Sequence, residues 1–390
     1  MLTTDAANSP VHRFEDARGA MTPLGTPFER VTKWLDDAEH DVLVLTGAAW
    51  VRWLTGYSRY GAGLSCVLVR SDGSAELFVP SYEVRFAREF VNESRVKLRA
   101  YTDVGYGLLR DPFTPLSSAF RQVQGLSDAR VAHVESDWLG GSGLLPSASF
   151  DVGPAIAKLR MVKSAVELDE MARRVAMCWV AQHAVSQALS WGASEIELYS
   201  LARASAEGHW GSPIEMNADV IGGPSCAGVG APVSVPGRRV VQTGETLIVD
   251  LVMGVSGYFA DITWTHIRGE NLEQAALRDS MVNVMETIAR GLVPGRRCSD
   301  VYREMEHLIH DVAPNDSFTH HGGHGIGLSG YEAPFLAPFD DTELEEGMTV
   351  AIEPGAYGRD HGVRVENNYV VTKHGGIEIP GRPLDMELLA

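Results

Sequence analysis

The chain has 390 residues, which is long for a single hydrophobic core and leads us to expect two domains. Its composition is that of an ordinary globular protein, with 45% hydrophobic and 22% charged residues and no low-complexity tract. The formal net charge of -18 argues against nucleic acid or an anionic membrane as a partner.

The N-terminal segment, up to about residue 25, is predicted to form a loose arm. It contains no apolar stretch that would serve as a secretory signal, and no run elsewhere is long enough to span a membrane. The four cysteines are scattered without CxxC spacing, which favours reduced, buried thiols over a catalytic cysteine. We therefore expect a cytoplasmic protein without a membrane partner.

Residues 1–158 mix strand and helix patterns and are predicted to form an α/β domain. A helical pattern at 27–39 precedes DVLVLTG, a branched apolar run typical of a buried strand. LSCVLVR and AELFVP, separated by a Ser-Asp-Gly-Ser turn, predict a hairpin. A helix is then expected at 81–95, and VKLRAY and RVAHVES are predicted strands.

Residues 159–390 show a second pattern, in which two helices are followed by strands and the order then repeats. Capping-box sequences begin the first two helices at Ser164 and Ser194. The four predicted helices are 164–191, 194–207, 271–292 and 299–312. The predicted strands are the hairpin at 246–267, TVAIEPG and GVRVENNYVVT. We predict an internal structural duplication whose halves meet over a shared site, in a chain that is α+β overall.

Asp250 and Asp261 lie on the two strands of the predicted hairpin, eleven residues apart. A carboxylate inside an apolar strand is unfavourable unless it is paired or binds a metal ion. Both side chains can point to one face, where they would repel each other unless a cation lay between them. A network with an arginine or with the backbone is the alternative interpretation of this pair.

His324 lies in the glycine-rich run HHGGHGIG, where glycines allow the backbone to approach closely. A phosphate-binding loop is disfavoured, because the run lacks the P-loop lysine and the strand–GxGxxG–helix context. Three histidines within five residues instead favour metal binding or acid–base chemistry.

Glu353 ends the apolar strand TVAIEPG, and Glu366 lies inside the strand-like run GVRVENNYV. Four carboxylates and one imidazole in apolar surroundings are difficult to explain without bound cations. Oxygen-rich ligation without thiolates suits manganese first, with cobalt, iron or zinc as alternatives. Two such ions that share carboxylates would lower the pKa of a water molecule and provide a nucleophile near neutral pH.

The motif order Asp-x10-Asp, HGIG, xEPG and GVRVE resembles the pita-bread metallohydrolase family, which includes methionine aminopeptidase, aminopeptidase P, prolidase and creatinase. The likeness covers about residues 159–390, and LRMVKSAVELDEM is similar to the start of the catalytic domain in the prolidase–creatinase branch. The preceding residues resemble the N-terminal domain of that branch. The resemblance also implies a homodimer.

The resemblance implies a role for each ligand. Asp250 would chelate one metal ion, Asp261 and Glu366 would bridge both ions, and His324 and Glu353 would bind the second. Glu353 would also accept a proton from the attacking water. Arg364 matches a family arginine near the substrate, with an ion pair on the strand face as the alternative.

Two departures from the family pattern concern histidines that bind the substrate. The region before Asp250 has no Pro-His pair, and Tyr331 stands before Glu332 where the family has His-Glu. Tyr331 is a candidate hydrogen-bond donor to an oxyanion, or else an aromatic packing residue. His320, His321 and His361 are candidates for the vacant roles, or else solvated loop histidines. Trp210 and Trp264 are assigned either to an apolar pocket or to the core.

These features predict a binuclear metal-dependent hydrolase that cleaves an amide-type C–N bond, most like an Xaa-Pro dipeptidase or aminopeptidase acting on a small peptide. The first alternative is a member of the same fold that acts on a small molecule, as creatinase, ectoine hydrolase and dimethylsulfoniopropionate lyase do. The second alternative is an inactive binding module, which would have no reason to keep all five ligands.

Overall fold

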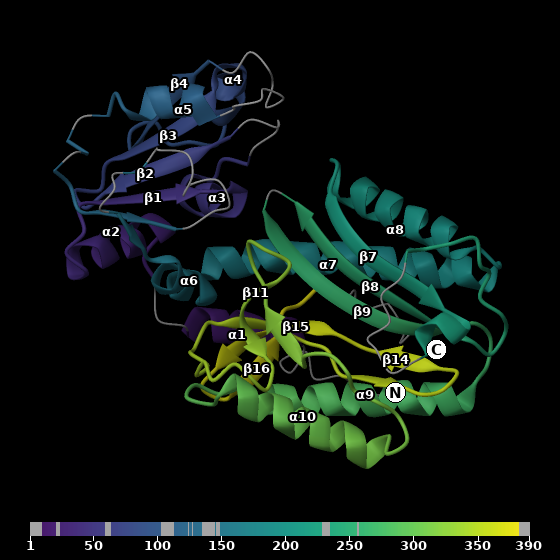
Figure 1. The fold of residues 1–390 in the computed structure, drawn as a ribbon. Coiled ribbons are helices and arrows are strands. Elements are labelled where there is room, and N and C mark those ends of the chain that lie inside the picture. The colour runs from purple at the N-terminus through teal and green to yellow at the C-terminus, as the bar shows by residue number, and fades with distance from the viewer. Residues whose placement is uncertain are drawn as a thin grey trace. The chain divides into compact units, whose positions relative to one another are not determined.

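The fold was analysed in a computed structural model, which describes residues 10–20, 24–58, 64–102, 113–123, 125–126, 128–134, 145, 149–227, 235–255 and 257–381. These residues form two compact units (Figure 1). One unit runs from Leu24 to Arg160, and the other combines the first helix with the chain from Met161 onward. None of the described helices is both long and apolar enough to cross a bilayer.

The N-terminal unit is built on a six-stranded mixed sheet with the order β4-β3-β2-β1-β5-β6. Its strands are β1 (Val42–Thr46), β2 (Cys66–Arg70), β3 (Ala75–Pro80), β4 (Val96–Tyr101), β5 (Val131–His133) and β6 (Phe150–Asp151). Its helices are α2 (Pro27–Asp37), α3 (Ala48–Thr55), α4 (Val84–Ala87), α5 (Phe113–Phe120) and α6 (Gly153–Met161). The predicted hairpin of β2 and β3 is confirmed, with Cys66 opposite Phe78 in an antiparallel register.

The helix predicted at 81–95 is much shorter than expected. A 3-10 turn at Ser81–Glu83 leads into α4, which ends at Ala87. The chain then turns at Asn92, whose side-chain Oδ1 accepts a hydrogen bond from the Ser94 backbone N–H at 3.1 Å. Such local bonds offer the backbone an alternative to the helix, so the predicted helix does not continue through the sequence Asn-Glu-Ser.

The C-terminal unit contains the predicted order of helix, helix and strands twice. The first half consists of α7 (Ala165–Ser190), α8 (Glu195–Trp210), β7 (Glu215–Gly222), β8 (Thr246–Val255) and β9 (Tyr258–Ile267). The second half begins with α9 (Leu272–Arg290) and α10 (Cys298–Val312). Its strands are β10 (Gly323–Gly325), β11 (Glu332–Leu336), β12 (Thr349–Ile352), β13 (Gly355–Tyr357), β14 (Gly362–Arg364), β15 (Asn367–Thr372) and β16 (Gly375–Glu378).

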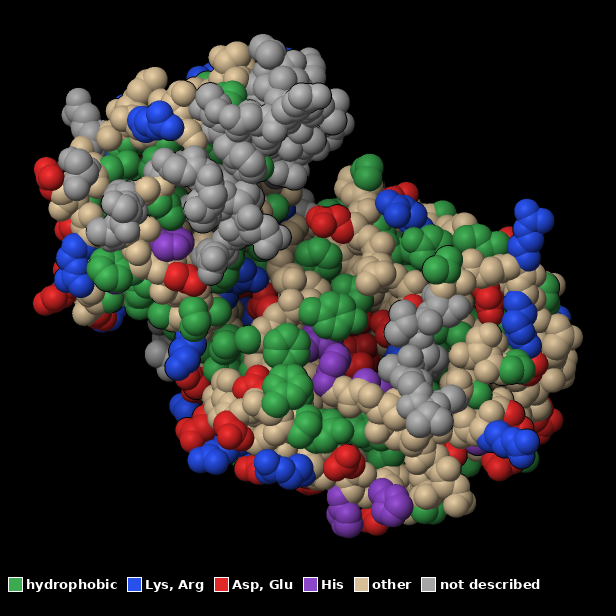
Figure 2. Space-filling view, viewed as in Figure 1, with side chains coloured by type: hydrophobic (Ala, Val, Ile, Leu, Met, Phe, Trp, Pro, Cys, Tyr) green, Lys and Arg blue, Asp and Glu red, His purple; other side chains and the backbone are tan. Residues whose placement is uncertain are grey.

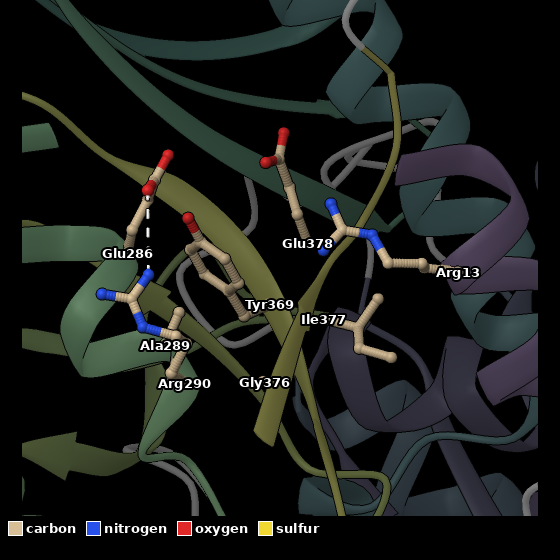
Figure 3. Close-up of a pocket in the computed structure, with 8 residues that line it drawn as sticks. All are labelled: Arg13, Glu286, Ala289, Arg290, Tyr369, Gly376, Ile377 and Glu378. Carbon is tan, nitrogen blue, oxygen red and sulfur yellow. Dashed lines mark ion pairs between the residues drawn. The ribbon is translucent and has the colours of Figure 1, made fainter. Parts of the chain in front are cut away.

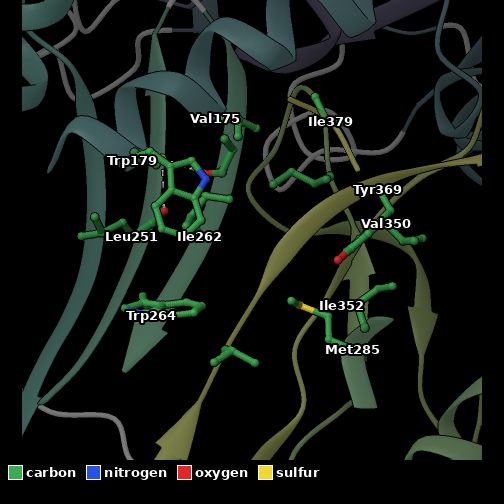
Figure 4. Packing of buried hydrophobic residues seen from close by; sticks show 14 of the residues in the cluster. Val175, Trp179, Leu251, Ile262, Trp264, Met285, Val350, Ile352, Tyr369 and Ile379 are labelled. Atoms are coloured by element: carbon green, nitrogen blue, oxygen red, sulfur yellow. Dashed lines mark hydrogen bonds between the residues drawn. The ribbon is translucent and has the colours of Figure 1, made fainter. Parts of the chain in front are cut away.

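Three sheets organise this unit: β7-β8-β9, β11-β10-β12-β15-β16, and the pair β13-β14. Both predicted capping boxes are present, and the backbone N–H groups of Ser164 and Ser194 each donate to a glutamate three residues on at 2.8 Å. Helix α7 packs on the β8–β9 hairpin, where Trp179 and Trp264 meet edge to face with ring centroids 5.9 Å apart (Figure 4). Gln182 on α7 donates to the carbonyls of Val249 and Ile262, which fixes the helix to both strands.

The expectation of a loose N-terminal arm is wrong for helix α1 (Pro10–Ala20). Phe14 on this helix is buried in the core of the C-terminal unit, and Arg18 forms an ion pair with Asp169 on α7. Burial of one large aromatic ring provides the stabilisation that the polar sequence around it did not suggest.

Candidate metal centre

The β8–β9 hairpin places Asp250 and Asp261 on the same face of its sheet, as predicted. Val252 lies directly opposite Asp261 in the antiparallel register, and Asp250 is two residues before Val252 on the same strand. Because side chains alternate along a strand, both carboxylates project from one face. Both are buried, and Asp261 is only 1% exposed.

The second half supplies the other three residues from the ends of short strands. His324 is the central residue of β10, and Glu353 follows the last residue of β12. Glu366 is not inside a strand, as the sequence suggested, but lies in the break between β14 and β15. Its backbone N–H donates to the carbonyl of Thr263 on β9 at 2.9 Å, so the break joins the two halves. Asn368 strengthens this junction by exchanging hydrogen bonds with the backbone of Asp261.

Three of the five predicted ligands converge on the imidazole nitrogen of a fourth, His324. The Nε2 atom of His324 lies 3.5 Å from Oδ2 of Asp261, 3.7 Å from Oε1 of Glu366 and 3.8 Å from Oε1 of Glu353. The ligand atoms of Asp261, His324 and Glu366 all lie within 4.8 Å of one another. Donors that surround one ion at about 2.0–2.2 Å have separations of this kind.

The converging atoms lack hydrogen-bond partners among the described residues, although they are buried. They are both carboxylate oxygens of Asp261, Nε2 of His324, Oε1 of Glu353 and Oε1 of Glu366. The remaining atoms of two ligands are already held: Nδ1 of His324 by the carbonyl of Gly325 at 2.9 Å, and Oε2 of Glu366 by the hydroxyl of Thr263 at 2.7 Å. Buried acceptors without donors are unfavourable, and a divalent cation would satisfy all of them. The residues therefore fit a metal ion.

The pKa values of these acids show the same crowding. Burial, and then the neighbouring carboxylates, raise the pKa of Asp261 and of Glu366 well above the ordinary range. Burial also acts to raise the pKa of Glu353, but His321, His320 and His324 outweigh it and lower that pKa to about 2. The acids consequently cannot all be ionised together unless positive charge is added.

Asp250 stands slightly apart, because it is paired with an arginine. Its Oδ2 lies 2.8 Å from Nη2 of Arg364, which also lies 3.5 Å from Oδ2 of Asp219. Asp250 remains close enough to Asp261 to raise the pKa of that carboxyl. The alternative interpretation of Asp250 was a network with an arginine, and that of Arg364 was an ion pair. The contact between the two residues shows that both interactions are present. The role of Asp250 as a ligand stays a prediction.

Asp219, which faces Asp250 in the β7–β8 register, was missing from the predicted site. Polar and apolar residues alternate from Glu215 to Val220, so strand β7 itself was predictable from the sequence. Its pairing with β8, which brings Asp219 next to Asp250, was not.

A buried polar chain leads from Arg364 to the other side of the cluster. Nη1 of Arg364 donates to the hydroxyl of Tyr357 at 3.2 Å, and this oxygen lies 2.8 Å from Nε2 of His320. Nδ1 of His320 in turn lies 3.6 Å from Oε2 of Glu353. Because burial lowers the pKa of His320 to about 4, this imidazole is neutral near pH 7. His320 is therefore part of the surroundings of the cluster and not a solvated loop residue.

Tyr331 lies over the cluster and is partly open to solvent. Its ring centroid is 4.2 Å from that of His324, and the residue is 47% exposed. Burial of its hydroxyl side and the nearby carboxylates raise the pKa of the phenol, so it remains protonated and can donate a hydrogen bond. In the space-filling view, histidine and carboxylate atoms of the C-terminal unit lie together in a hollow bordered by hydrophobic side chains (Figure 2).

The remaining candidates differ in their positions. Nδ1 of His321 lies 2.8 Å from Oε1 of Glu353, without the alignment of a hydrogen bond. His361 is not brought to the cluster: its imidazole contacts Asp316 at 3.1 Å and Asp360 at 3.2 Å. Trp264 belongs to the core, and Trp210 packs against the guanidinium of Arg174, 4.4 Å from its ring centroid.

A separate cavity of about 240 Å³ in the same unit contains none of the predicted site residues (Figure 3). Arg13, Arg290, Glu286 and Glu378 line it together with Tyr369. Two positive and two negative side chains balance each other there, and Arg290 pairs with Glu286 at 3.9 Å.

Comparison with known proteins agrees with this geometry. Residues 160–373 match the metallopeptidase family M24, and residues 28–162 match the creatinase/prolidase N-terminal domain. YkvY, a putative dipeptidase of Bacillus subtilis, is 24% identical over 93% of this chain and 99% of its own length. An Xaa-Pro dipeptidase of Pyrococcus furiosus is 23% identical over 89% of this chain and 95% of its own. Among solved structures, the prolidase from Pyrococcus horikoshii has a TM-score of 0.76 at 20% identity, covering 93% of this chain and all 100% of that one.

Proposed function

Because the chain belongs to the metallopeptidase family M24, we propose that its carboxylate–histidine cluster binds two divalent metal ions and that the enzyme hydrolyses Xaa-Pro dipeptides. The convergence of buried acceptor atoms without donors on His324 carries this proposal. The names of the relatives from Bacillus subtilis and Pyrococcus furiosus support a dipeptide as the substrate. We further propose manganese as the native metal and a cytoplasmic homodimer. The two proposed domains are residues 1–158 and 159–390, apart from helix α1, which packs in the core of the C-terminal unit.

Each side chain has a proposed role. Asp261, Glu366, His324 and Glu353 hold the ions, and Asp250 joins them from its position beside Asp261. When bound, the ions polarise the scissile carbonyl and lower the pKa of water. Glu353 accepts the proton of the attacking water, because its carboxylate is ionised at neutral pH and its Oε1 lies at the cluster, 3.8 Å from Nε2 of His324.

Two further residues surround the reacting carbonyl. Tyr331 donates its phenolic hydrogen to the developing oxyanion, since its hydroxyl stays protonated above the cluster. Arg364 orients Asp250 through their ion pair at 2.8 Å. We leave His361 out of the catalytic group because its imidazole contacts Asp316 and Asp360.

The test is turnover of a panel of Xaa-Pro dipeptides by protein loaded with manganese, with the matching Xaa-Ala dipeptides as controls. We expect hydrolysis of the Xaa-Pro members, its loss on treatment with a chelator, and two ions per chain by elemental analysis. A metal content near zero after reconstitution would overturn the proposal.

One observation favours a second candidate, a hydrolase of a small non-peptide amide. Tyr331 occupies the position of a substrate-binding histidine in the related peptidases, and the Pro-His pair is also missing from the sequence. Full metal occupancy without turnover of any dipeptide would favour this candidate over the dipeptidase.

A further inference from the structure

A buried ion pair lies next to the cluster without being part of it. Lys163, just before α7, is only 2% exposed, and its Nζ lies 2.7 Å from Oε1 of Glu332. The same ammonium group donates to the carbonyl of Met161 at 3.2 Å. The backbone N–H of Lys163 donates to the carbonyl of Gly347 at 2.9 Å. The lysine is therefore fixed at both its backbone and its charged end.

Glu332 connects this pair to the proposed oxyanion donor, because it is the neighbour of Tyr331 in the chain. It is also the first residue of β11, which pairs with the strand that carries His324. No described residue forms a hydrogen bond with the Tyr331 hydroxyl, so the position of this ring depends on its contacts with His321 and His324 and on the segment that carries it. The carboxylate of Glu332 ties that segment to Lys163.

Two glycines of the HGIG motif allow the segment to lie close to His324. A Cβ atom at Gly325 would stand 2.2 Å from the carbonyl oxygen of Ala333. A Cβ atom at Gly327 would stand 2.7 Å from Cε of Lys163 and 2.8 Å from Oε1 of Glu332. The ion pair thus crosses directly over Gly327, and any side chain there would push the pair away.

We infer that Lys163 is a positioning residue that acts through Glu332 to hold the Tyr331 ring over the metal cluster. The inference rests on the oxyanion role proposed above for Tyr331. A charge-assisted hydrogen bond has a specific geometry, and separating a buried charged pair is unfavourable, so the pair resists displacement. In this chain the Lys163–Glu332 pair helps to place Tyr331, which stands where related peptidases have a histidine.

The experiment combines kinetics and crystallography on the full, manganese-loaded chain. The variants are Lys163→Met, Tyr331→Phe and their combination, with Lys163→Arg as the conservative form. Arg174→Met is the matched control, because Arg174 is an equally buried cation in the same unit that contacts Glu170, Val255 and Trp210 and not Glu332. If Lys163→Met does not fold, Lys163→Met combined with Glu332→Leu replaces the pair by apolar side chains and leaves no buried charge.

We expect Tyr331→Phe to lower kcat about a hundredfold, as the loss of an oxyanion donor does. Lys163→Met should lower kcat by about tenfold or more, with little change in KM or metal content, and Lys163→Arg should recover most of it. In the Tyr331→Phe background, Lys163→Met should have no further effect, because the lysine acts only through this tyrosine. Arg174→Met should leave kcat unchanged.

Additive losses of kcat in the variant that combines Lys163→Met with Tyr331→Phe would overturn the inference. So would a crystal structure of Lys163→Met in which the rings of Tyr331 and His324 keep their centroid separation of 4.2 Å. Displacement of the Tyr331 ring in that crystal structure supports it. If the wild-type enzyme turns over no Xaa-Pro dipeptide, the proposed substrate fails, and the crystal structure alone decides the role of Lys163.

Discussion

The guanidinium of Arg364 and the carboxylate of Asp250 form a buried ion pair, with Nη2 and Oδ2 separated by 2.8 Å. Asp219 approaches the same nitrogen at 3.5 Å from the facing strand. One arginine therefore offsets part of the negative charge of two acids beside a cluster that already holds more negative charge than burial tolerates. The protein supplies a cation on one side of the site, and a metal ion is needed on the other.

Replacing Arg364 by methionine should destabilise the metal-free protein by about 3 kcal/mol, because it leaves buried acids without their partner. Addition of manganese should raise the free energy of unfolding more in this variant than in the wild type, since the ion then also neutralises Asp250. Denaturant unfolding with and without the metal measures both quantities. Arg174→Met is the control, and an equal gain from manganese in the two variants would contradict the account.

Replacing Asp261 by asparagine should weaken manganese binding by at least about a hundredfold, because it removes a charged ligand that faces His324. The metal-free variant should nevertheless melt at a higher temperature than the metal-free wild type at pH 8. In the wild type, burial and neighbouring carboxylates raise the pKa of Asp261, so the ionised form of this side chain destabilises the fold. Calorimetric titration and thermal melts test the two effects, with Asp316→Asn as the control. A lower melting temperature for the metal-free Asp261 variant would show that its charge is already compensated.

The metal-free protein should become less stable as the pH rises. The pKa values of Asp261 and Glu366 are raised in the folded state, so the folded state retains protons that the unfolded state releases. This contribution is fully present below the unfolded pKa of about 4 and is lost as pH rises through the folded pKa. Melting temperatures with a chelator should therefore fall as the pH rises above about 4, while the gain from manganese grows. A gain that does not change with pH would contradict the assignment.

His361→Gln should leave kcat unchanged and alter only stability. Burial acts to lower the pKa of His361, but hydrogen bonds to Asp316 and Asp360 outweigh it and raise the pKa. The protonated form therefore stabilises the fold below the unfolded pKa of about 6.5, and the effect is lost as pH rises through the folded value. The variant should lose about 0.5 kcal/mol at acid pH and almost nothing at alkaline pH. An exposed histidine changed in the same way, His374→Gln, is the control, and a large fall in kcat would return His361 to the catalytic group.

The catalytic unit was largely predictable because its signals are local. Capping boxes at Ser164 and Ser194, and the alternation along β8 and β9, gave both the elements and the face shared by Asp250 and Asp261. The acids were noticed because a carboxylate in an apolar run is unfavourable without a partner. Residues His324, Glu353 and Glu366 followed from the family motifs.

The failures involve contacts that no local pattern shows. Helix α1 depends on burial of Phe14 against core residues from Met161 onward, more than a hundred residues later in the chain. The closeness of Asp219 to Arg364 follows only from the β7–β8 register. The break that places Glu366 next to Thr263 could not be read from GVRVENNYV, because this contact joins residues 103 positions apart.

The most direct test of the central claim is an anomalous-scattering map from a crystal of the wild-type protein soaked with manganese. The account predicts two peaks, both within about 2.5 Å of carboxylate or imidazole atoms of the group around His324, with Asp261 and Glu366 between them. A map with no peak at this group, with the same side chains bound to each other or to ordered water instead, would contradict it.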